Sequence, residues 1–367
     1  MQFCEVNYMK YVFPLIISMI LLCGCAANSD AASSTESRAE TTATEDPFAE
    51  HSEDASQNYD PFAEDSSDGE EELGAFSCGV EWEPGRECVL DYAPTVTFPY
   101  YIENNAGRTD FGLLIFVNGF RQPYRTDSEP EDAVLHSFSV DEDERLHPKI
   151  SFEPVVGEMG ETLTVEIVSM FHPGFVLTDK TIHAALNFNH RILSLFPSSM
   201  TVTEQIGLRP PKVCTDYTEI PITAELRDAY TEQSGNQLDR LFFLEALKND
   251  ALITPRDRLT QSVPKTVFRG GDALTLCVYG GGRPYTYRVS MYLDHALVPG
   301  VFDGCDYIDM TPSADTMCKK EIDTSLLPLK DEWSHLYFIA VPIYTDTDYA
   351  NRRVEKSESA AIIGIPS

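Results

Sequence analysis

The sequence predicts a mainly β fold that contains two immunoglobulin-like β-sandwich domains. Segments rich in β-branched and aromatic residues recur roughly every 10–20 residues from about residue 76 onward, a spacing typical of antiparallel sandwiches. Pro, Gly, Asn and Asp separate these segments, and such residues mark turns. Helical periodicity is confined to one region, so we expect strands to dominate.

The first sandwich is predicted over residues 74–206. Its clearest strand is the apolar run 111–117, which ends at the turn signal Asn118-Gly119. Residues 162–168 alternate with the period of two expected of a strand. Further strands are expected at 95–102, 135–140, 193–196 and 200–203.

The second sandwich is predicted over residues 207–367, after a boundary at the Pro-rich segment 207–211. A helical insertion is expected at about 222–250, because Leu238, Leu241 and Phe242 follow helical spacing. Strands are expected at 274–279, 285–293 and 335–343.

The two halves share a local pattern. In both 111–124 and 287–299 a strand leads into a polar pair, and a proline follows a few residues later. We therefore expect two copies of one sandwich module, although two unrelated sandwiches would produce a similar pattern.

An export and lipidation signal lies near the N-terminus. Lys10 precedes the apolar stretch 11–22, which is too short for a membrane-spanning helix of about 20 residues. Leu22-Cys23-Gly24-Cys25 follows it and resembles the bacterial lipoprotein signal. That resemblance implies that residues 1–24 are removed and that Cys25 is lipidated. A signal peptide cut nearby, or an uncleaved anchor, is the alternative.

Residues 25–73 are predicted to form a disordered tether. The segment after Cys25 holds fifteen acidic residues and one basic residue, Arg38, and it has few bulky apolar side chains with which to build a core. The pentapeptide at 46–50 recurs at 60–64, either as a duplicated linker or as a bivalent binding motif. With the signal and the sandwich modules, this layout resembles uncharacterised surface lipoproteins of Gram-positive bacteria.

The charge of the chain excludes some partners and leaves room for others. A formal net charge of −32 opposes binding to the phosphate backbone of nucleic acids. Acidic loops can bind calcium, and the weak candidates are Asp303, Asp306 and Asp309. Solvated acidic turns are the alternative. We expect no cofactor, with calcium as the one weak candidate.

Nine cysteines are present, and six of them follow Cys25. In an exported chain an even number permits disulfides. The candidate pairs are Cys78 with Cys88, which flank a Pro-Gly turn, and Cys305 with Cys318 on adjacent strands. Buried free thiols are the alternative, and no zinc-ligand spacing occurs.

No catalytic residue can be assigned from the sequence. The glycines at 280–282 lead into a strand rather than a helix, which argues against a phosphate-binding loop. The histidines are scattered, and no nucleophile motif is present.

These observations favour a lipid-anchored protein on the extracellular face of the cell membrane that acts as a non-enzymatic binding or scaffolding module. Besides the membrane, its expected partner is an envelope protein or a cell-wall glycan. A hydrolase with paired carboxylates is the first alternative. A solute-binding lipoprotein of a transporter is the second, and it would need α/β lobes.

Overall fold

The computed structural model describes residues 76–85, 88–105, 107–178, 192–194, 197–204, 210–224, 227–228, 242–248, 267–280, 285–330, 332–343, 354–357 and 360–364. All of them belong to one compact unit, Gly69–Ser367. Cys25, the predicted tether and its pentapeptide repeats lie outside the described residues. Within the described part of the chain, no helix has the length and apolar character needed to cross a membrane.

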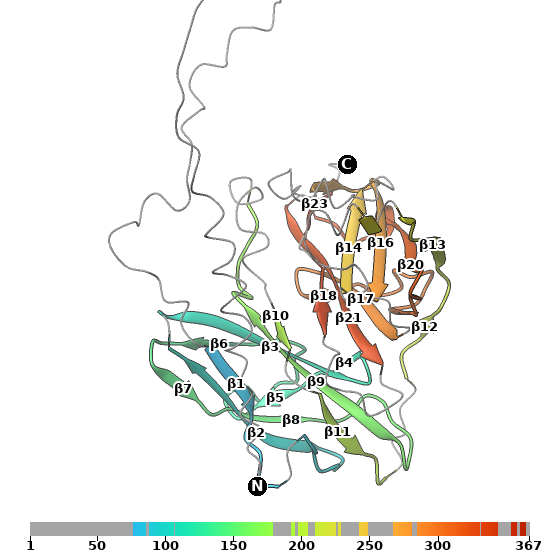
Figure 1. Ribbon diagram of the computed structural model, residues 1–367. Helices are drawn as coiled ribbons and strands as arrows, with labels where there is room; N and C mark the ends of the chain where they lie inside the picture. The colour runs from blue at the N-terminus through green and yellow to red at the C-terminus, as the bar shows by residue number, and fades with distance from the viewer. Residues whose placement is uncertain are drawn as a thin grey trace, which may run out of the picture. The chain divides into compact units, whose positions relative to one another are not determined.

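The first sandwich consists of two antiparallel sheets (Figure 1). One sheet has the order β1-β2-β8-β5, with β7 also paired to β2. Its strands are β1 (Phe76–Val80), β2 (Val96–Asn104), β5 (Arg125–Thr126), β7 (Glu144–Leu146) and β8 (Lys149–Phe152). The other has the order β10-β9-β3-β4, with β11 paired to β9 and β6 paired to β3. Its strands are β3 (Thr109–Val117), β4 (Phe120–Arg121), β6 (His136–Val140), β9 (Thr162–Phe171), β10 (Ile192–Ser194) and β11 (Ser198–Thr201).

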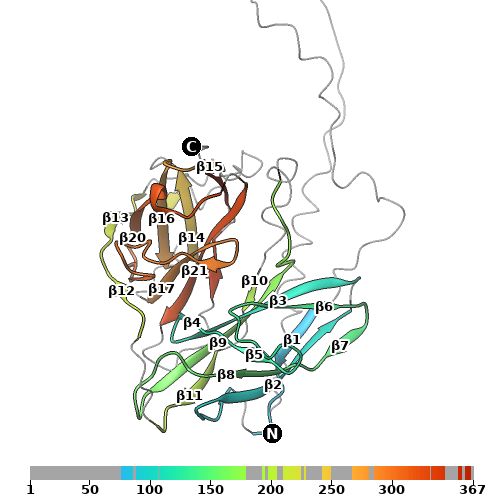
Figure 2. The ribbon, with the colours of Figure 1, turned by 180° about the vertical axis from the view of Figure 1, so that it is seen from behind.

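The second sandwich repeats this two-sheet plan. Its larger sheet has the order β12-β19-β17-β21-β23-β15, with β18 paired to β17 and β22 paired to β21. Its strands are β12 (Val213–Cys214), β15 (Val267–Arg269), β17 (Thr286–Leu293), β18 (Ala296–Leu297), β19 (Tyr307–Met310), β21 (Ser334–Ile343), β22 (Glu355–Lys356) and β23 (Ala360–Ile363). The smaller sheet, visible from behind in Figure 2, has the order β13-β20-β16-β14. Its strands are β13 (Thr218–Pro221), β14 (Phe242–Lys248), β16 (Ala273–Gly280) and β20 (Thr316–Asp323), and the 3-10 helix η2 (Thr324–Leu326) follows β20.

The predicted mainly β class with two sandwiches is confirmed. The strands expected at 111–117, 162–168 and 335–343 correspond to β3, β9 and β21, and those expected at 274–279 and 285–293 correspond to β16 and β17. Pairing is antiparallel throughout the described strands except between β12 and β19 and between β15 and β23.

The predicted helical insertion is partly wrong. Phe242–Lys248 forms strand β14, which pairs antiparallel with β16 from Phe242↔Gly280 to Lys248↔Leu274. Only Ala224, Arg227 and Asp228 are helical among the described residues of 222–250. A short apolar run suits either structure, and the hydrogen bonds to β16 outweigh the local helical spacing.

The central strands β3, β9, β17 and β21 have apolar side chains on both faces. In β3, Phe111, Leu113, Ile115 and Val117 belong to the core of the first sandwich, whereas Leu114 and Phe116 pack in a second cluster on the other face. Strand β21 divides in the same way, with Leu336 and Phe338 in its own core and Tyr337 and Ile339 in that second cluster. Successive side chains of a strand point to opposite faces, so these sheets are buried on both sides.

The two sandwiches share one type of hairpin. After β3, Asn118 and Gly119 have φ values of 47° and 76°. After β17, Asp294 and His295 have φ values of 48° and 66°. Positive φ at both central residues defines the I′ turn, whose twist matches the strands it joins. The polar pairs noticed in the sequence are therefore equivalent turns.

The first residue of each turn is fixed by its side chain. Asn118 Oδ1 accepts a hydrogen bond from the backbone N–H of Thr164 at 2.7 Å, and the backbone N–H of Asn118 donates to the carbonyl of Thr164 at 2.9 Å. Asp294 makes the same two contacts with His335, at 2.8 and 2.9 Å. This shared geometry supports the predicted relation between the two modules.

Replacing Asn118 or Asp294 with alanine is expected to lower the free energy of unfolding by about 1–2 kcal/mol, because a backbone N–H loses its acceptor. The exchange Asp294→Asn keeps an acceptor oxygen and should cost less than half as much. No such control is used at position 118, because Asn118 Nδ2 donates to Glu161 Oε1 at 3.0 Å and an aspartate there would place two carboxylates together. Urea unfolding of the three variants measures the difference. Equal losses for Asp294→Ala and Asp294→Asn would show that the side-chain acceptor does not matter.

Candidate functional site

The two sandwiches meet at a junction that is packed like a protein interior. One apolar cluster combines Leu114, Phe116, Val168 and Met170 of the first sandwich with Tyr292, Tyr337, Ile339, Val341 and Val354 of the second. All of these residues except Val354 are completely buried. The sheets containing β3 and β9 on one side and β17 and β21 on the other therefore face each other.

Matching rows of side chains cross the two sheets at this junction. In the first sandwich, Arg121 pairs in register with Phe116, which pairs with Glu166. In the second, Tyr292 pairs with Tyr337 on one side, and their rings stack with centroids 5.3 Å apart. Both rows lie two residues before the equivalent I′ turns, so corresponding positions of the two modules meet. Glu166 is the one acidic side chain among the described residues that is fully buried.

Arg288 of β17 joins the two sandwiches. Its Nε and Nη2 donate to the two carboxylate oxygens of Asp309, each at 2.8 Å, in a bidentate pair. Its Nη1 donates to the carbonyl of Asn118 at 2.8 Å, and its guanidinium lies 4.0 Å from the ring centre of Phe120. One side chain thus fixes the first I′ turn against the second sheet.

Gly119 permits this close approach. A Cβ at this position would lie 2.8 Å from Ile343 Cδ1 and 3.0 Å from Arg288 Cβ, and φ is positive. A larger residue would therefore both strain the backbone and push the second sandwich away.

The side chains of His295, His335 and Tyr337 lie together beside the junction, at the second I′ turn. His295 Nδ1 and Tyr337 Oη are 2.8 Å apart, and the rings of His295 and His335 have centroids 6.4 Å apart. Burial lowers the pKa of His335 to about 4, and repulsion from His295 adds to the shift. Burial likewise lowers the pKa of His295 to about 4. Both rings are therefore neutral at neutral pH, and they pack as structural side chains.

The stability of the protein is expected to fall as the pH decreases from about 6.5 to about 4. An unfolded histidine titrates near pH 6.5. Between these pH values His335 is protonated in the unfolded chain but neutral in the folded chain. Proton binding therefore favours the unfolded state, and the free energy of unfolding falls. The free energy of unfolding should drop by about 2 kcal/mol for His335 between pH 7 and pH 5.

Urea unfolding at several pH values measures this loss. The His335→Gln variant should show a shallower dependence on pH than the unmodified protein. The matched control is His147→Gln, because His147 is exposed and contacts Glu81 on the surface. An unchanged pH dependence in His335→Gln would contradict the prediction.

The three calcium candidates have separate structural partners. Asp303 forms an ion pair with Lys320, Asp306 Oδ1 accepts from the backbone N–H of Gly300 at 2.7 Å, and Asp309 binds Arg288. No group of three or more His, Cys, Asp or Glu side chains suited to a metal occurs within the described ranges. The close spacing of these residues in the sequence therefore does not bring their carboxylates together.

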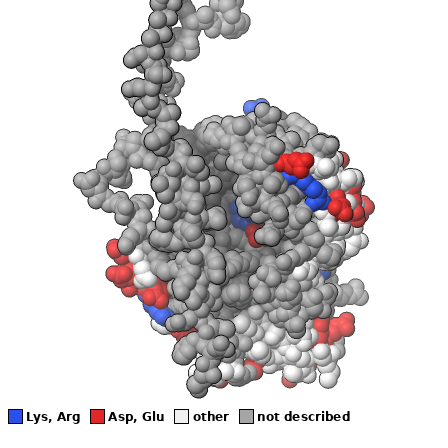
Figure 3. All heavy atoms as spheres, in the orientation of Figure 1, with Lys and Arg blue, Asp and Glu red and all other residues white. Residues whose placement is uncertain are grey.

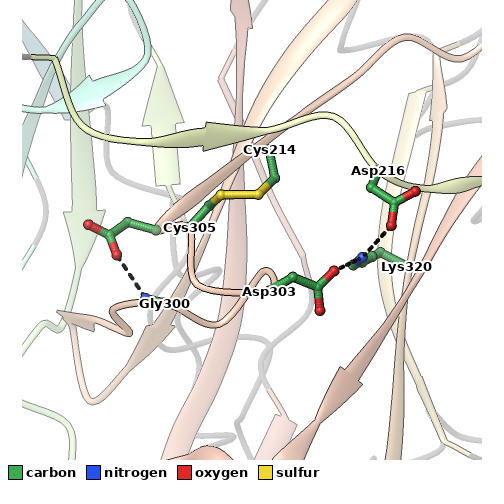
Figure 4. The surroundings of a disulfide bond; sticks show 7 residues. Cys214, Asp216, Gly300, Asp303, Cys305 and Lys320 are labelled. Carbon is green, nitrogen blue, oxygen red and sulfur yellow. Dashed lines mark hydrogen bonds and ion pairs between the residues drawn. A yellow bond between two sulfur atoms is a disulfide. The ribbon is translucent and has the colours of Figure 1, made fainter.

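The structure pairs the cysteines differently from the expected pairs. Cys305 is bonded to Cys214, with Cα atoms 5.9 Å apart (Figure 4). Cys78, Cys88 and Cys318 take part in no disulfide in the structure. Cys78 lies on β1 and its sulfur contacts Ser169 Oγ at 3.2 Å. Burial raises the pKa of the Cys318 thiol to about 12.

The bond joins two segments that are far apart in the sequence. The parallel pairing of β12 with β19 brings Cys214 beside the turn that carries Cys305. Beside this bond, Lys320 extends between Asp303 and Asp216 and forms an ion pair with each (Figure 4). Spacing along the chain could not indicate this pairing, because it depends on which strands become neighbours.

The described charged side chains do not form one continuous patch in the view of Figure 3. Red acidic groups gather in small clusters, several of them beside blue basic groups. Glu81 illustrates the arrangement, because it lies within 3.6 Å of Arg145 and 2.8 Å of His147. Such exposed pairs contribute little to stability, and they suit a solvated surface.

Comparisons with known proteins assign no family. No family model and no curated protein sequence matches the chain. Among solved structures, red sea bream transglutaminase matches with a TM-score of 0.20 and 10% identity over 80% of this chain, which spans 31% of that enzyme's chain. The E. coli chaperone DraB matches with a TM-score of 0.22 and 9% identity, covering 79% of this chain and 98% of that one. The YadV chaperone gives a TM-score of 0.20 and 7% identity, over 77% of this chain and 98% of its own. Similarities this low carry no argument about function.

Proposed function

We propose that this chain is a membrane-anchored extracellular lipoprotein that acts as a non-enzymatic binding or scaffolding module of the cell envelope. The observation that carries the proposal is the completely buried apolar junction between the two sandwiches. A junction packed in this way resists hinge motion, so it would present surface residues of both modules in a fixed arrangement. The lipid on Cys25 and the tether of residues 25–73 are part of the proposal and rest on the sequence.

The same junction weakens the two alternatives. A solute-binding protein that closes around its ligand needs two α/β lobes and a hinge, whereas the described chain is mainly β and its sandwiches are clamped by Arg288. A hydrolase of the paired-carboxylate type needs two carboxylates that converge in a cleft. Glu166, the one fully buried acidic side chain in the described part of the chain, lies in the row that faces the second sandwich.

The anchor is tested by expressing the full chain in a Gram-positive host with an alkyne-labelled fatty acid. The unmodified chain and Cys23→Ser, the matched control, should incorporate the label and fractionate with the membrane. Cys25→Ser should incorporate no label and should leave the membrane fraction. Labelling of Cys25→Ser, or no labelling of the unmodified chain, would contradict the proposed anchor.

The binding role is tested by immobilising the full chain and passing purified cell-wall glycan and envelope protein fractions over it, with and without calcium. Saturable retention of one component without release of soluble fragments is expected. Release of glycan or peptide fragments would establish the hydrolase instead. Absence of saturable retention in every fraction would contradict a binding role.

A further inference from the structure

We propose that Arg121, Tyr292 and Tyr307 form a site at the junction that binds an oxyanion, namely the carboxylate or phosphate group of a small ligand. Arg121 comes from β4 of the first sandwich, and the two tyrosines come from β17 and β19 of the second. The proposal goes beyond the binding role proposed above and does not depend on the lipid anchor.

Arg121 is a buried cation with unused hydrogen-bond donors. The residue is 6% exposed, and its Nε and Nη2 are buried without a hydrogen-bond partner. Its guanidinium lies 4.9 Å from the ring centre of Tyr292, a cation–π contact that favours the charge. Burying donors without acceptors is strongly unfavourable, so such a group calls for an explanation such as a bound ion.

The neighbouring tyrosines add further donors. Ser290 Oγ donates to Tyr292 Oη at 3.0 Å, and the backbone N–H of Arg121 donates to Tyr307 Oη at 3.3 Å. Each tyrosine oxygen is the acceptor in its contact, so each hydroxyl proton remains available for another acceptor. Burial raises the pKa of both Tyr292 and Tyr307, which keeps the hydroxyls protonated at neutral pH.

The described residues provide too few hydrogen-bond acceptors for the donors of Arg121, Tyr292 and Tyr307. No carboxylate among the described residues lies within hydrogen-bonding distance of Nε or Nη2 of Arg121. Glu166 occupies the same row but is separated from Arg121 by the strand that carries Phe116. Asp306 is near Tyr307, and its Oδ1 already accepts from the backbone N–H of Gly300.

An oxyanion would supply what the cluster lacks. It carries negative charge and several lone pairs, and the fork of a guanidinium matches carboxylate and phosphate oxygens. Because the donors come from both sandwiches, the ligand would also strengthen their junction. Binding to the folded chain alone would raise its stability by mass action.

The test is titration calorimetry and thermal unfolding of the full chain with inorganic phosphate and with formate, at constant ionic strength. We expect saturable binding of one or both anions and a matching rise in melting temperature. Arg121→Met should weaken binding roughly 10- to 100-fold, since a charged donor is lost, and Tyr292→Phe should weaken it roughly 5-fold. Arg125→Met is the matched control, because Arg125 pairs with Asp132 at the surface.

Each outcome decides the proposal. Phosphate binding without formate binding identifies a tetrahedral phosphate group as the ligand chemistry, and the reverse identifies a carboxylate. No saturable binding of either anion, or equal responses in the unmodified chain and Arg121→Met, would overturn the site. If Arg121→Met does not fold, Tyr292→Phe and Tyr307→Phe provide the same comparison, and unchanged affinity in both would overturn it.

Discussion

Replacing Arg288 with alanine is expected to lower the free energy of unfolding by about 3 kcal/mol, in the range found when one partner of a largely buried ion pair is removed. The Arg288 and Asp309 side chains are 12% and 21% exposed. The substitution leaves Asp309 with no guanidinium, removes the hydrogen bond to the carbonyl of Asn118, and exposes the ring of Phe120.

Guanidinium denaturation monitored by fluorescence and by limited proteolysis would measure this effect. We expect Arg288→Ala to unfold at lower denaturant concentration and to be cut between the sandwiches before either core is digested. The matched control, Arg125→Ala, breaks an exposed pair and should cost less than about 1 kcal/mol. Equal losses in the two variants would mean that Arg288 does not clamp the junction.

Much of the fold could be predicted from local sequence. The strands at 111–117, 162–168 and 335–343 were recognisable because each consists largely of β-branched, aromatic and other apolar residues. The error at 242–248 has the opposite cause. Its apolar residues fit helical spacing as well, and only the pairing with β16 determines the strand.

The sequence contains one pattern that predicts the junction between the sandwiches. A strand with one face in water alternates, whereas 111–117 and 335–343 are nearly continuously apolar. Such runs require burial on both faces, which in β3 and β21 is provided by the other sandwich. By contrast, no local pattern distinguishes Arg121 from an ordinary surface arginine, because its burial depends on a strand about 170 residues away.

Removing the disulfide by the double substitution of Cys214 and Cys305 with serine is expected to cost about 4.6 kcal/mol in the chain-entropy account of a cross-link. The two cysteines are 91 residues apart, so the bond restricts a long loop of the unfolded chain. In the folded chain it holds β12, whose parallel pairing with β19 covers only two register pairs. Urea unfolding under oxidising and reducing conditions would measure the loss.

This experiment also decides between the disulfide in the structure and the Cys78–Cys88 pair suggested by the sequence. Reduction should destabilise the unmodified chain and a Cys78→Ser/Cys88→Ser variant by the same amount, and it should not affect the Cys214→Ser/Cys305→Ser variant. If Cys78 and Cys88 were bonded instead, reduction would still destabilise the latter variant. Because Cys214 lies on β12, loss of its bond should also loosen the attachment of this strand to β19.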